Sequence, residues 1–244
     1  MTLDNAVDRY NERVMSNILS LDFWGTIAVF NPQYAAARTR LFADRFQLPD
    51  DEAHARYQYI KRHCDHQAET FGSGVTPLVA VKRMLEGMNI KPSVDAVSIL
   101  EDIEELVRRF PPLLDRRVAP RLTELRGSGE WKIGVASNTN FIRGSLVAEI
   151  FPNLHWDFAV YSDEVGVSKP DPDFFRTVML QARIAAKDRS IAPRDMIHIG
   201  DNSACDVRGP ERVGMRAALT KSPDETVAML ERLIRGGPTA LPTG

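Results

Sequence analysis

The chain has 244 residues, 43% of them hydrophobic, and its 31 basic and 33 acidic residues give a formal net charge of −2. This length can bury one core domain together with a smaller insert. The basic residues gather in no stripe of the kind that binds nucleic acid, and no run of about 18 apolar residues is present to cross a membrane, so a small anionic molecule is the expected partner.

The N-terminal segment, MTLDNAVDRYNERVMSNILSLDF, is polar. It shows no basic cluster followed by an apolar run, so we expect no secretory signal and a cytoplasmic protein. The two cysteines, Cys64 and Cys205, lie far apart in the sequence, and in a protein that is not secreted we expect free thiols. The oligomeric state, monomer or homodimer, stays open.

Short apolar runs alternate with helical stretches along most of the chain, which is typical of a parallel α/β sheet. We expect strands at Asn17–Asp22, Trp131–Ser137, Phe158–Ser162, Met196–Asp201 and Met215–Leu219. We expect helices at Asn140–Ile150, Pro172–Ala186, Ala204–Val213 and Glu225–Ile234. Strands that are apolar on both sides suit a sheet covered by helices on both faces, so the predicted fold class is a doubly wound, Rossmann-like α/β fold.

The alternation stops between about Pro32 and Pro120, where the sequence shows no convincing strand. Four segments in this stretch have the apolar spacing of amphipathic helices: Tyr34–Phe46, Asp51–Glu69, Pro77–Met88 and Ser93–Phe110. We therefore predict that residues 1–31 and 121–244 form the sheet domain and that residues 32–120 form an inserted all-helical domain.

Polar residues stand where the predicted strands end, which is where ligands bind in open parallel sheets. They are Asp22 after the first strand, Ser137 and Asn138 after the second, Lys169 shortly after the third, and Asp201 and Asp206 after the fourth. A single aspartate after a strand is most often a turn residue or a helix cap. Four polar segments in this order, each at a strand exit, favour one shared site instead.

These segments resemble the four motifs of the haloacid dehalogenase superfamily, which are Asp-x-x-x-Thr, Ser/Thr, Lys-Pro and Gly-Asp-x-x-x-x-Asp. The resemblance covers residues 17–220 in order and is most specific in GVSKPDPDFF and HIGDNSACDVRGPERVGM. The helical insert resembles the small cap domain that these proteins place between the first and second motifs. The resemblance implies a hydrolase that uses Mg²⁺.

The resemblance also implies a role for each residue. Asp22 is expected to attack phosphorus or carbon and to form a covalent aspartyl intermediate. The Ser137 hydroxyl and the backbone N–H groups of Trp24 and Asn138 would hold the oxygens of the transferred group, and Lys169 would balance negative charge. The expected Mg²⁺ ligands are the carboxylates of Asp22 and Asp201 and the carbonyl of Trp24, with Asp206 as a further ligand or neighbour.

One position departs from the pattern. Phosphatases of the superfamily usually carry a second aspartate two residues after the nucleophile, where it protonates the leaving group, but this chain has Trp24 there. Help from a general acid is worth roughly 10²–10⁴ in rate. We therefore expect the rate to depend steeply on the leaving group, unless another residue, such as one from the insert, donates the proton.

Two relatives that lack this aspartate supply alternatives. The L-2-haloacid dehalogenases have Asp-x-Tyr-Gly-Thr and release a halide that needs no proton. The phosphonoacetaldehyde hydrolases form a Schiff base with a cap lysine, and Lys61 lies near that position, although YQYIKRHCDH otherwise matches poorly and favours an exposed helical lysine. A member without turnover that binds a phosphorylated ligand is a third alternative.

The fourth motif favours phosphoryl transfer among these alternatives. Two further carboxylates, Asp201 and Asp206, would repel the charge of Asp22 unless a cation lay among them. The leading hypothesis is a magnesium-dependent phosphatase of a small phosphorylated metabolite.

Other polar or aromatic groups in the sequence carry weaker signals. We interpret the cluster from His63 to His66 as a solvated helix face rather than a zinc site. The arginines of the insert, among them Arg38, are expected to be mostly solvated. Trp24 and Phe30 are expected to line the apolar side of the pocket or to support the junction with the insert.

Overall fold

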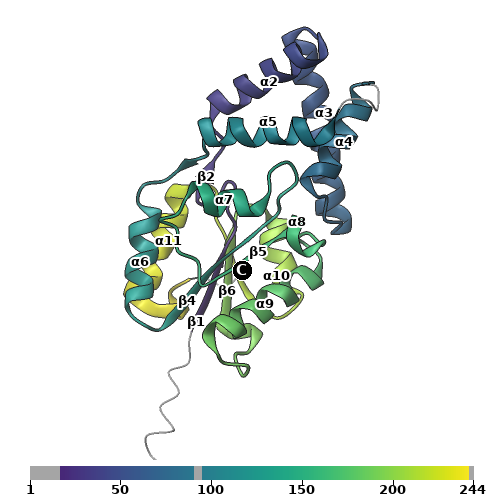
Figure 1. Ribbon diagram of the computed structural model, residues 1–244. Coiled ribbons are helices and arrows are strands. Elements are labelled where there is room, and N and C mark those ends of the chain that lie inside the picture. Colours follow the sequence, from purple (N-terminus) through teal and green to yellow (C-terminus); the bar gives the residue numbers. More distant parts are fainter. Residues whose placement is uncertain (1–16, 91–94, 242–244) are drawn as a thin grey trace, which may run out of the picture.

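The computed structural model describes residues 17–90 and 95–241. Within them, five parallel strands form one sheet in the order β5-β4-β1-β6-β7 (Figure 1). The strands are β1 (Asn17–Leu21), β4 (Trp131–Ser137), β5 (Phe158–Tyr161), β6 (Met196–Gly200) and β7 (Arg216–Leu219). Their bounds agree with the sequence prediction to within one residue, and the α/β fold class is confirmed. The polar segment before Asn17 and the start of the helix predicted at Ser93 lie outside the described residues.

The first strand lies at the centre of the sheet. Leu21, its last residue, is paired with Val135 of β4 on one side and with Ile199 of β6 on the other. The residues that follow these three strands therefore meet at one edge of the sheet, where parallel sheets bind their ligands.

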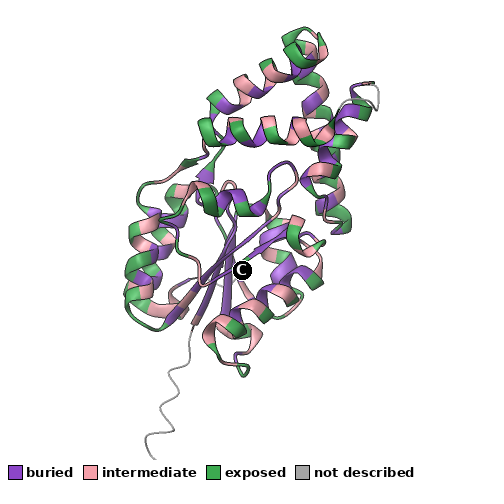
Figure 2. Ribbon diagram, in the orientation of Figure 1, coloured by how far each residue is buried: buried purple, intermediate pink, exposed green. Residues whose placement is uncertain are grey.

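Helices cover both faces of the sheet because successive side chains of a strand point to opposite sides. Leu19 packs in the hydrophobic cluster that holds α6 (Val118–Gly127) and α11 (Pro223–Gly236) against one face. Ile18 packs in the cluster of α9 (Pro172–Ala186) on the other face. Figure 2 shows the strands buried between these helices, whose outer surfaces are exposed.

The insert contains the four helices expected from its sequence, α2 (Pro32–Phe46), α3 (Asp50–Phe71), α4 (Pro77–Gly87) and α5 (Ala96–Arg109). Asn31 and Thr76 cap α2 and α4 with their side chains, and in both helices a proline follows the cap directly. Most of the buried apolar residues of the four helices form one hydrophobic cluster, separate from the clusters that pack on the sheet. The insert lies beyond the carboxyl ends of the strands (Figure 1).

Two short elements at the junction were not predicted. The expectation that residues 32–120 contain no strand is wrong at β3 (Leu113–Leu114), which pairs antiparallel with β2 (Ala28–Val29). The helix α6 begins at Val118, two residues before Pro120, and this valine packs in the cluster of the sheet. A proline is tolerated in the first turn of a helix, where it removes no helical hydrogen bond. The division of the chain at residues 31 and 120 stays a prediction.

The helix predicted from Asn140 begins later, as α7 (Gly144–Ile150). The residues before it serve as a bridge to the insert. The Asn140 side chain donates a hydrogen bond to Asp65 over 2.9 Å, and the Phe141 ring packs in the insert cluster at 5.4 Å from the Tyr57 ring. These contacts outweigh the local preference for helix.

The helix predicted at Ala204–Val213 is replaced by two shorter pieces, a π-helix over Ser203–Arg208 and α10 (Gly209–Glu211). The Asn202 side chain caps the wide turn by accepting hydrogen bonds from two backbone N–H groups. The π-helix directs the Asp206 carboxylate back toward the end of β6, where it accepts a hydrogen bond from the Asn202 N–H over 2.9 Å.

Two general expectations can be compared with the structure. Cys64 and Cys205 are free thiols, as predicted, and both are buried. Across residues 17–90 and 95–241, no helix has both the length and the apolar character that crossing a bilayer requires.

Candidate active site

A cavity of about 410 Å³ lies between the carboxyl edge of the sheet and the insert. The sheet domain contributes Asp22, Trp24, Asn138, Lys169, Asp201 and Asp206 to its lining. The insert contributes Tyr34, Tyr57, Lys61, Asp65 and Glu69. All the residues predicted for the site line this cavity except Ser137, which is fully buried at the end of β4.

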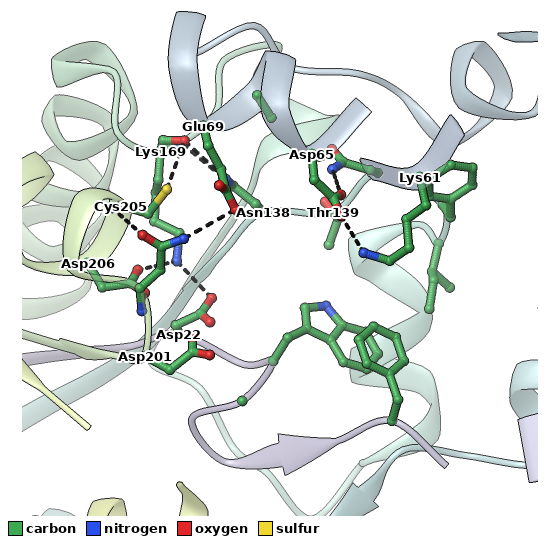
Figure 3. A pocket seen from close by; sticks show the side chains of 18 of the residues that line it. Asp22, Lys61, Asp65, Glu69, Asn138, Thr139, Lys169, Asp201, Cys205 and Asp206 are labelled. Atoms are coloured by element: carbon green, nitrogen blue, oxygen red, sulfur yellow. Dashed lines mark hydrogen bonds and ion pairs between the residues drawn. The ribbon is translucent and has the colours of Figure 1, made fainter. Parts of the chain in front are cut away.

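The centre of the site is a buried lysine between two carboxylates (Figure 3). Nζ of Lys169 lies 2.7 Å from Oδ1 of Asp22 and 2.6 Å from Oδ1 of Asp206. The exposed fractions of the three side chains are 2%, 8% and 1% in that order. Because water cannot screen such buried charges, the lysine balances charge far better here than it would on the surface.

The pKa values of these groups reflect burial and charge pairing. Burial favours the neutral form of Lys169, but the charges of Asp206 and Asp22 outweigh it and raise the pKa of the ammonium, which stays protonated. Burial raises the pKa of Asp22. Lys169 lowers it and the charge of Asp206 raises it, and the net shift is upward. Burial also acts to raise the pKa of Asp206, but Lys169 and His198 outweigh it and hold the pKa of this carboxyl well below its usual range.

Two residues that sequence reasoning missed hold Asp206 in place. Nε2 of His198 lies 3.1 Å from Oδ1 of Asp206, and Nδ1 of the same ring lies 2.8 Å from the Ser20 hydroxyl. Both side chains are fully buried inside the sheet. Their signal in the sequence was a polar residue between apolar neighbours in each of two strands, Ser20 in NILSL and His198 in MIHIG.

Asp201 completes an acidic cluster at the end of β6. The carboxylates of Asp22, Asp201 and Asp206 each offer an oxygen, and these oxygens lie within 4.8 Å of one another. Among the described residues this is the one group of three such side chains that could hold a metal ion. Burial and the charges of its two neighbours raise the pKa of Asp201 to about 6. A set of oxygen ligands with uncompensated charge suits a hard divalent cation, so these residues fit Mg²⁺.

Two glycines of the motifs make room for this cluster. A Cβ atom on Gly25 would lie 2.1 Å from Oδ2 of Asp201, and Gly25 has a φ of +74° that other residues rarely adopt. A Cβ atom on Gly200 would lie 2.2 Å from Cγ of Asp206. The glycine before Asp201 and the glycine after Trp24 are thus required by close packing at the site.

Asn138 fixes the loop that carries the lysine. Its side-chain oxygen accepts the Lys169 N–H over 2.8 Å, and its amide donates to the Lys169 carbonyl over 3.1 Å. Sequence reasoning assigned only the backbone N–H of Asn138 to the site. The neighbouring Ser137 hydroxyl is buried and has no hydrogen bond of good geometry among the described residues, although its interaction with Asp22 slightly lowers the pKa of that carboxyl.

Where phosphatases of the superfamily usually carry a second aspartate, this chain has the apolar side chain of Trp24. The Trp24 indole stacks on the Phe30 ring, with 4.4 Å between ring centroids and 7° between planes, and both rings line the cavity. This side of the site can contact carbon atoms of a ligand but supplies no carboxyl group.

The helix α3 brings three charged residues to the cavity, Lys61, Asp65 and Glu69, spaced four apart on one face. Lys61 forms an ion pair with Asp65, and its ammonium lies 6.0 Å from the centre of the Phe30 ring. Lys61 is helical, as expected, but its side chain is only 30% exposed and lines the cavity. Glu69 accepts a hydrogen bond from the Asn202 side chain over 3.2 Å.

Two other expectations for the insert concern Arg38 and the cluster from His63 to His66. Arg38 is buried and not solvated, with its guanidinium 3.6 Å from the centre of the Tyr57 ring. Of the sequence cluster from His63 to His66, Cys64 is buried in the insert core and Asp65 turns to the cavity.

A parallel sheet that presents an aspartate, a buried lysine and an acidic cluster beneath a helical insert is typical of hydrolases in which an aspartate is the nucleophile. The family model of the haloacid dehalogenase-like hydrolases matches residues 17–214, and the chain belongs to this family.

Among curated relatives, haloacid dehalogenase-like hydrolase domain-containing protein 3 of mouse and of human is 32% identical over 88 and 102 residues, which are 36% and 42% of this chain. The chain spans about a third of their length, 32% and 38%. The glyceraldehyde 3-phosphate phosphatase of Methanopyrus kandleri is 28% identical over 131 residues, which cover 53% of this chain and 52% of that protein.

Solved structures share the fold. The HAD-hydrolase YfnB from Bacillus subtilis, bound to magnesium, superimposes with a TM-score of 0.63 at 16% identity and covers 89% of this chain and 99% of that one. The L-2-haloacid dehalogenase from Xanthobacter autotrophicus superimposes with a TM-score of 0.56 at 19% identity, covering 93% of this chain and 85% of that one.

Proposed function

We propose that the protein is a magnesium-dependent phosphatase that acts on a small phosphorylated metabolite, with Asp22 as the nucleophile. The observation that carries this proposal is a cluster of three carboxylates, two of which, Asp22 and Asp206, share one buried ammonium. The phosphate dianion and the Asp22 carboxylate are both negative, so the phosphate could approach Asp22 only if positive charge offset the two anions. Lys169 supplies one such charge, and the cluster of Asp22, Asp201 and Asp206 has the composition that holds a second as Mg²⁺.

Each group on the sheet side then has a task. Asp22 attacks phosphorus and becomes an aspartyl phosphate, while Lys169 offsets negative charge. Mg²⁺, held by Asp22, Asp201 and Asp206, would supply further positive charge at the transferred group. The Ser137 hydroxyl, which lacks a partner of good geometry among the described residues, donates to an oxygen of the transferred group together with the N–H groups of Trp24 and Asn138. The name of the Methanopyrus kandleri relative agrees with phosphate-ester hydrolysis. The cavity of about 410 Å³ suits a metabolite and not a macromolecule.

One observation favours a second candidate, hydrolysis of a carbon–phosphorus bond. Lys61 lines the cavity, where it could form a Schiff base with a carbonyl substrate. Its ammonium is engaged by Asp65 and faces Phe30, which favours a charge-pairing role over that of a nucleophilic amine.

One screen separates these candidates. Phosphate esters, phosphonoacetaldehyde and 2-haloacids are each incubated with enzyme in Mg²⁺ and in EDTA. We expect phosphate release from esters that requires Mg²⁺. Robust hydrolysis in EDTA contradicts the magnesium phosphatase, and EDTA-resistant release of halide from a 2-haloacid indicates a dehalogenase.

A further inference from the structure

The proposed function leaves a chemical gap. A phosphorylated metabolite releases an alkoxide, which departs poorly without a proton. The aromatic pair Trp24 and Phe30 occupies the position where the superfamily's phosphatases carry the acid. A donor must therefore come from another part of the cavity.

The acids that line the cavity, within the described part of the chain, fall into two groups. Asp22, Asp201 and Asp206 form the acidic cluster and are committed to the nucleophile and the metal. Asp65 and Glu69 come from α3 of the insert and face the cluster from the opposite wall.

The two acids of α3 are held differently. Asp65 is occupied, because it pairs with the Lys61 ammonium and accepts a hydrogen bond from Asn140 over 2.9 Å. Glu69 forms no ion pair with residues 17–90 or 95–241, and it accepts a hydrogen bond from a neutral amide, that of Asn202, over 3.2 Å. Within this part of the chain, Asp65 is paired directly with a cation and Glu69 is not.

The position of Glu69 also suits proton transfer. Asn202 follows Asp201 directly in the chain, so its hydrogen bond holds the Glu69 carboxyl over the end of β6. In Figure 3 the Glu69 side chain points from the insert toward Asp22, Asp201 and Asp206, whereas Lys61 and Asp65 lie on the far side of the cavity.

The surroundings of Glu69 favour its protonated form. Partial burial and then the charge of Asp65 raise the pKa of its carboxyl. Lys61 lowers the pKa, Asp206 raises it and His66 lowers it, and the net shift is upward. A carboxyl group whose pKa is raised above its usual value is the type of group that serves as a general acid.

We infer that Glu69 is the general acid and base of this enzyme, a proposal that rests on the phosphatase function proposed above. When an Asp22 oxygen attacks phosphorus, the bond between phosphorus and the substrate oxygen breaks, and the Glu69 carboxyl gives its proton to that oxygen, which leaves as an alcohol. Water then attacks the phosphorus of the aspartyl phosphate and loses a proton to the Glu69 carboxylate. The bond to Asp22 breaks, which restores its carboxylate and releases inorganic phosphate.

The test compares Glu69→Gln with Glu86→Gln. Glutamine keeps an oxygen that can accept the Asn202 hydrogen bond but cannot give the proton, and Glu86 is an exposed glutamate of α4 in the same insert. Activity is measured with Mg²⁺ on an alkyl phosphate and on an aryl phosphate whose phenol needs no proton to leave. For Glu69→Gln we expect kcat/KM on the alkyl ester to fall by roughly 10²–10⁴ and on the aryl ester by less than about 10-fold. Glu86→Gln should match wild type on both.

Two further readouts distinguish this role from a structural one. In wild type, kcat/KM on the alkyl ester should decline as pH rises and Glu69 loses its proton, and this decline should be absent in Glu69→Gln. The variant should also show a burst of phenol with the aryl ester, because the aspartyl phosphate breaks down slowly without a base.

Equal losses on both esters, or an unchanged pH profile, would overturn the role of Glu69. That outcome leaves the phosphatase function intact as long as wild type hydrolyses both esters with Mg²⁺ and Asp22→Asn does not. If Asp22→Asn remains active, the proposed function itself has failed.

Discussion

The two walls of the cavity are built in different ways. The sheet wall takes its side chains from the ends of β1, β4 and β6 and from the loop after β5, and at its centre Lys169, Asp22 and Asp206 are buried, with Lys169 only 2% exposed. The insert wall takes Lys61, Asp65 and Glu69 from one face of a single helix, and Lys61 and Asp65 are each 30% exposed. The sheet wall holds the proposed nucleophile and metal ligands, and the insert wall adds partly exposed charged groups that could contact the rest of a substrate. Glu69 is the exception, because it places part of the chemistry on the insert.

The largest effect should come from the nucleophile on the sheet wall. Asp22→Asn should lower kcat by at least about 10⁴, because an amide is a poor nucleophile and removing a nucleophile has costs of this order or more. Steady-state assays on an aryl phosphate in Mg²⁺ measure the loss, and a thermal melt tests whether the variant stays folded. Substantial turnover by a folded Asp22→Asn protein would exclude Asp22 as the nucleophile.

The buried lysine should also be needed for stability. Lys169→Met leaves the Asp22 and Asp206 carboxylates buried without their ammonium, which costs roughly 3–5 kcal/mol when one partner of a buried pair is removed. Urea unfolding in EDTA measures the free energy of unfolding. The control is Lys82→Met, which replaces an exposed lysine of α4 and should change this free energy by no more than about 0.5 kcal/mol. A loss no larger than that of the control would show that the lysine does not compensate these charges.

A glycine of the first motif tests the acidic cluster. Gly25→Ala forces a Cβ atom to within 2.1 Å of Asp201 at a φ of +74°, so the carboxylate must move and the backbone is strained by about 1–2 kcal/mol. We expect weaker Mg²⁺ binding by calorimetry. Gly127→Ala, where the new methyl meets nothing within 4 Å, should bind Mg²⁺ as wild type does. Equal Mg²⁺ affinity in both variants would argue against a metal ligand at Asp201.

The smallest effect should come from Lys61 on the insert wall. Lys61→Ala removes a partly exposed cation that pairs with Asp65, and we expect KM to rise a few-fold with little change in kcat. Borohydride added with phosphonoacetaldehyde should trap no adduct. An adduct mapped to Lys61, together with loss of all activity in Lys61→Ala, would support the carbon–phosphorus hydrolase instead.

The same difference between the walls explains what the sequence could predict. The strands and the residues at their ends were predictable, because an apolar run followed by a polar residue marks a strand exit, as at Asp22 and Asp201. The helix over Asn140–Ile150 was predicted too long, since the loop before α7 is held by contacts with residues of the insert, about 75 positions earlier in the chain. Such contacts leave no local pattern.

The roles of side chains were harder to predict than their positions. His198 and Ser20 looked like chance polar residues in apolar strands, and only the folded sheet brings them together beneath Asp206. Glu69 had no motif, because its contact with Asn202 depends on how α3 docks on the sheet domain. The spacing of Lys61, Asp65 and Glu69 on one helix face was the signal that could have directed attention to this wall.

In the proposed reaction, phosphate passes through a covalent bond to Asp22, which acid quenching followed by mass spectrometry can detect. Wild-type enzyme is mixed with an aryl phosphate in Mg²⁺, quenched within milliseconds and digested at low pH. We expect the peptide containing Asp22 to carry one phosphoryl group, which is absent in EDTA and in Asp22→Asn. Rapid turnover without a phosphorylated Asp22 peptide, or with the phosphoryl group on another residue, would contradict it.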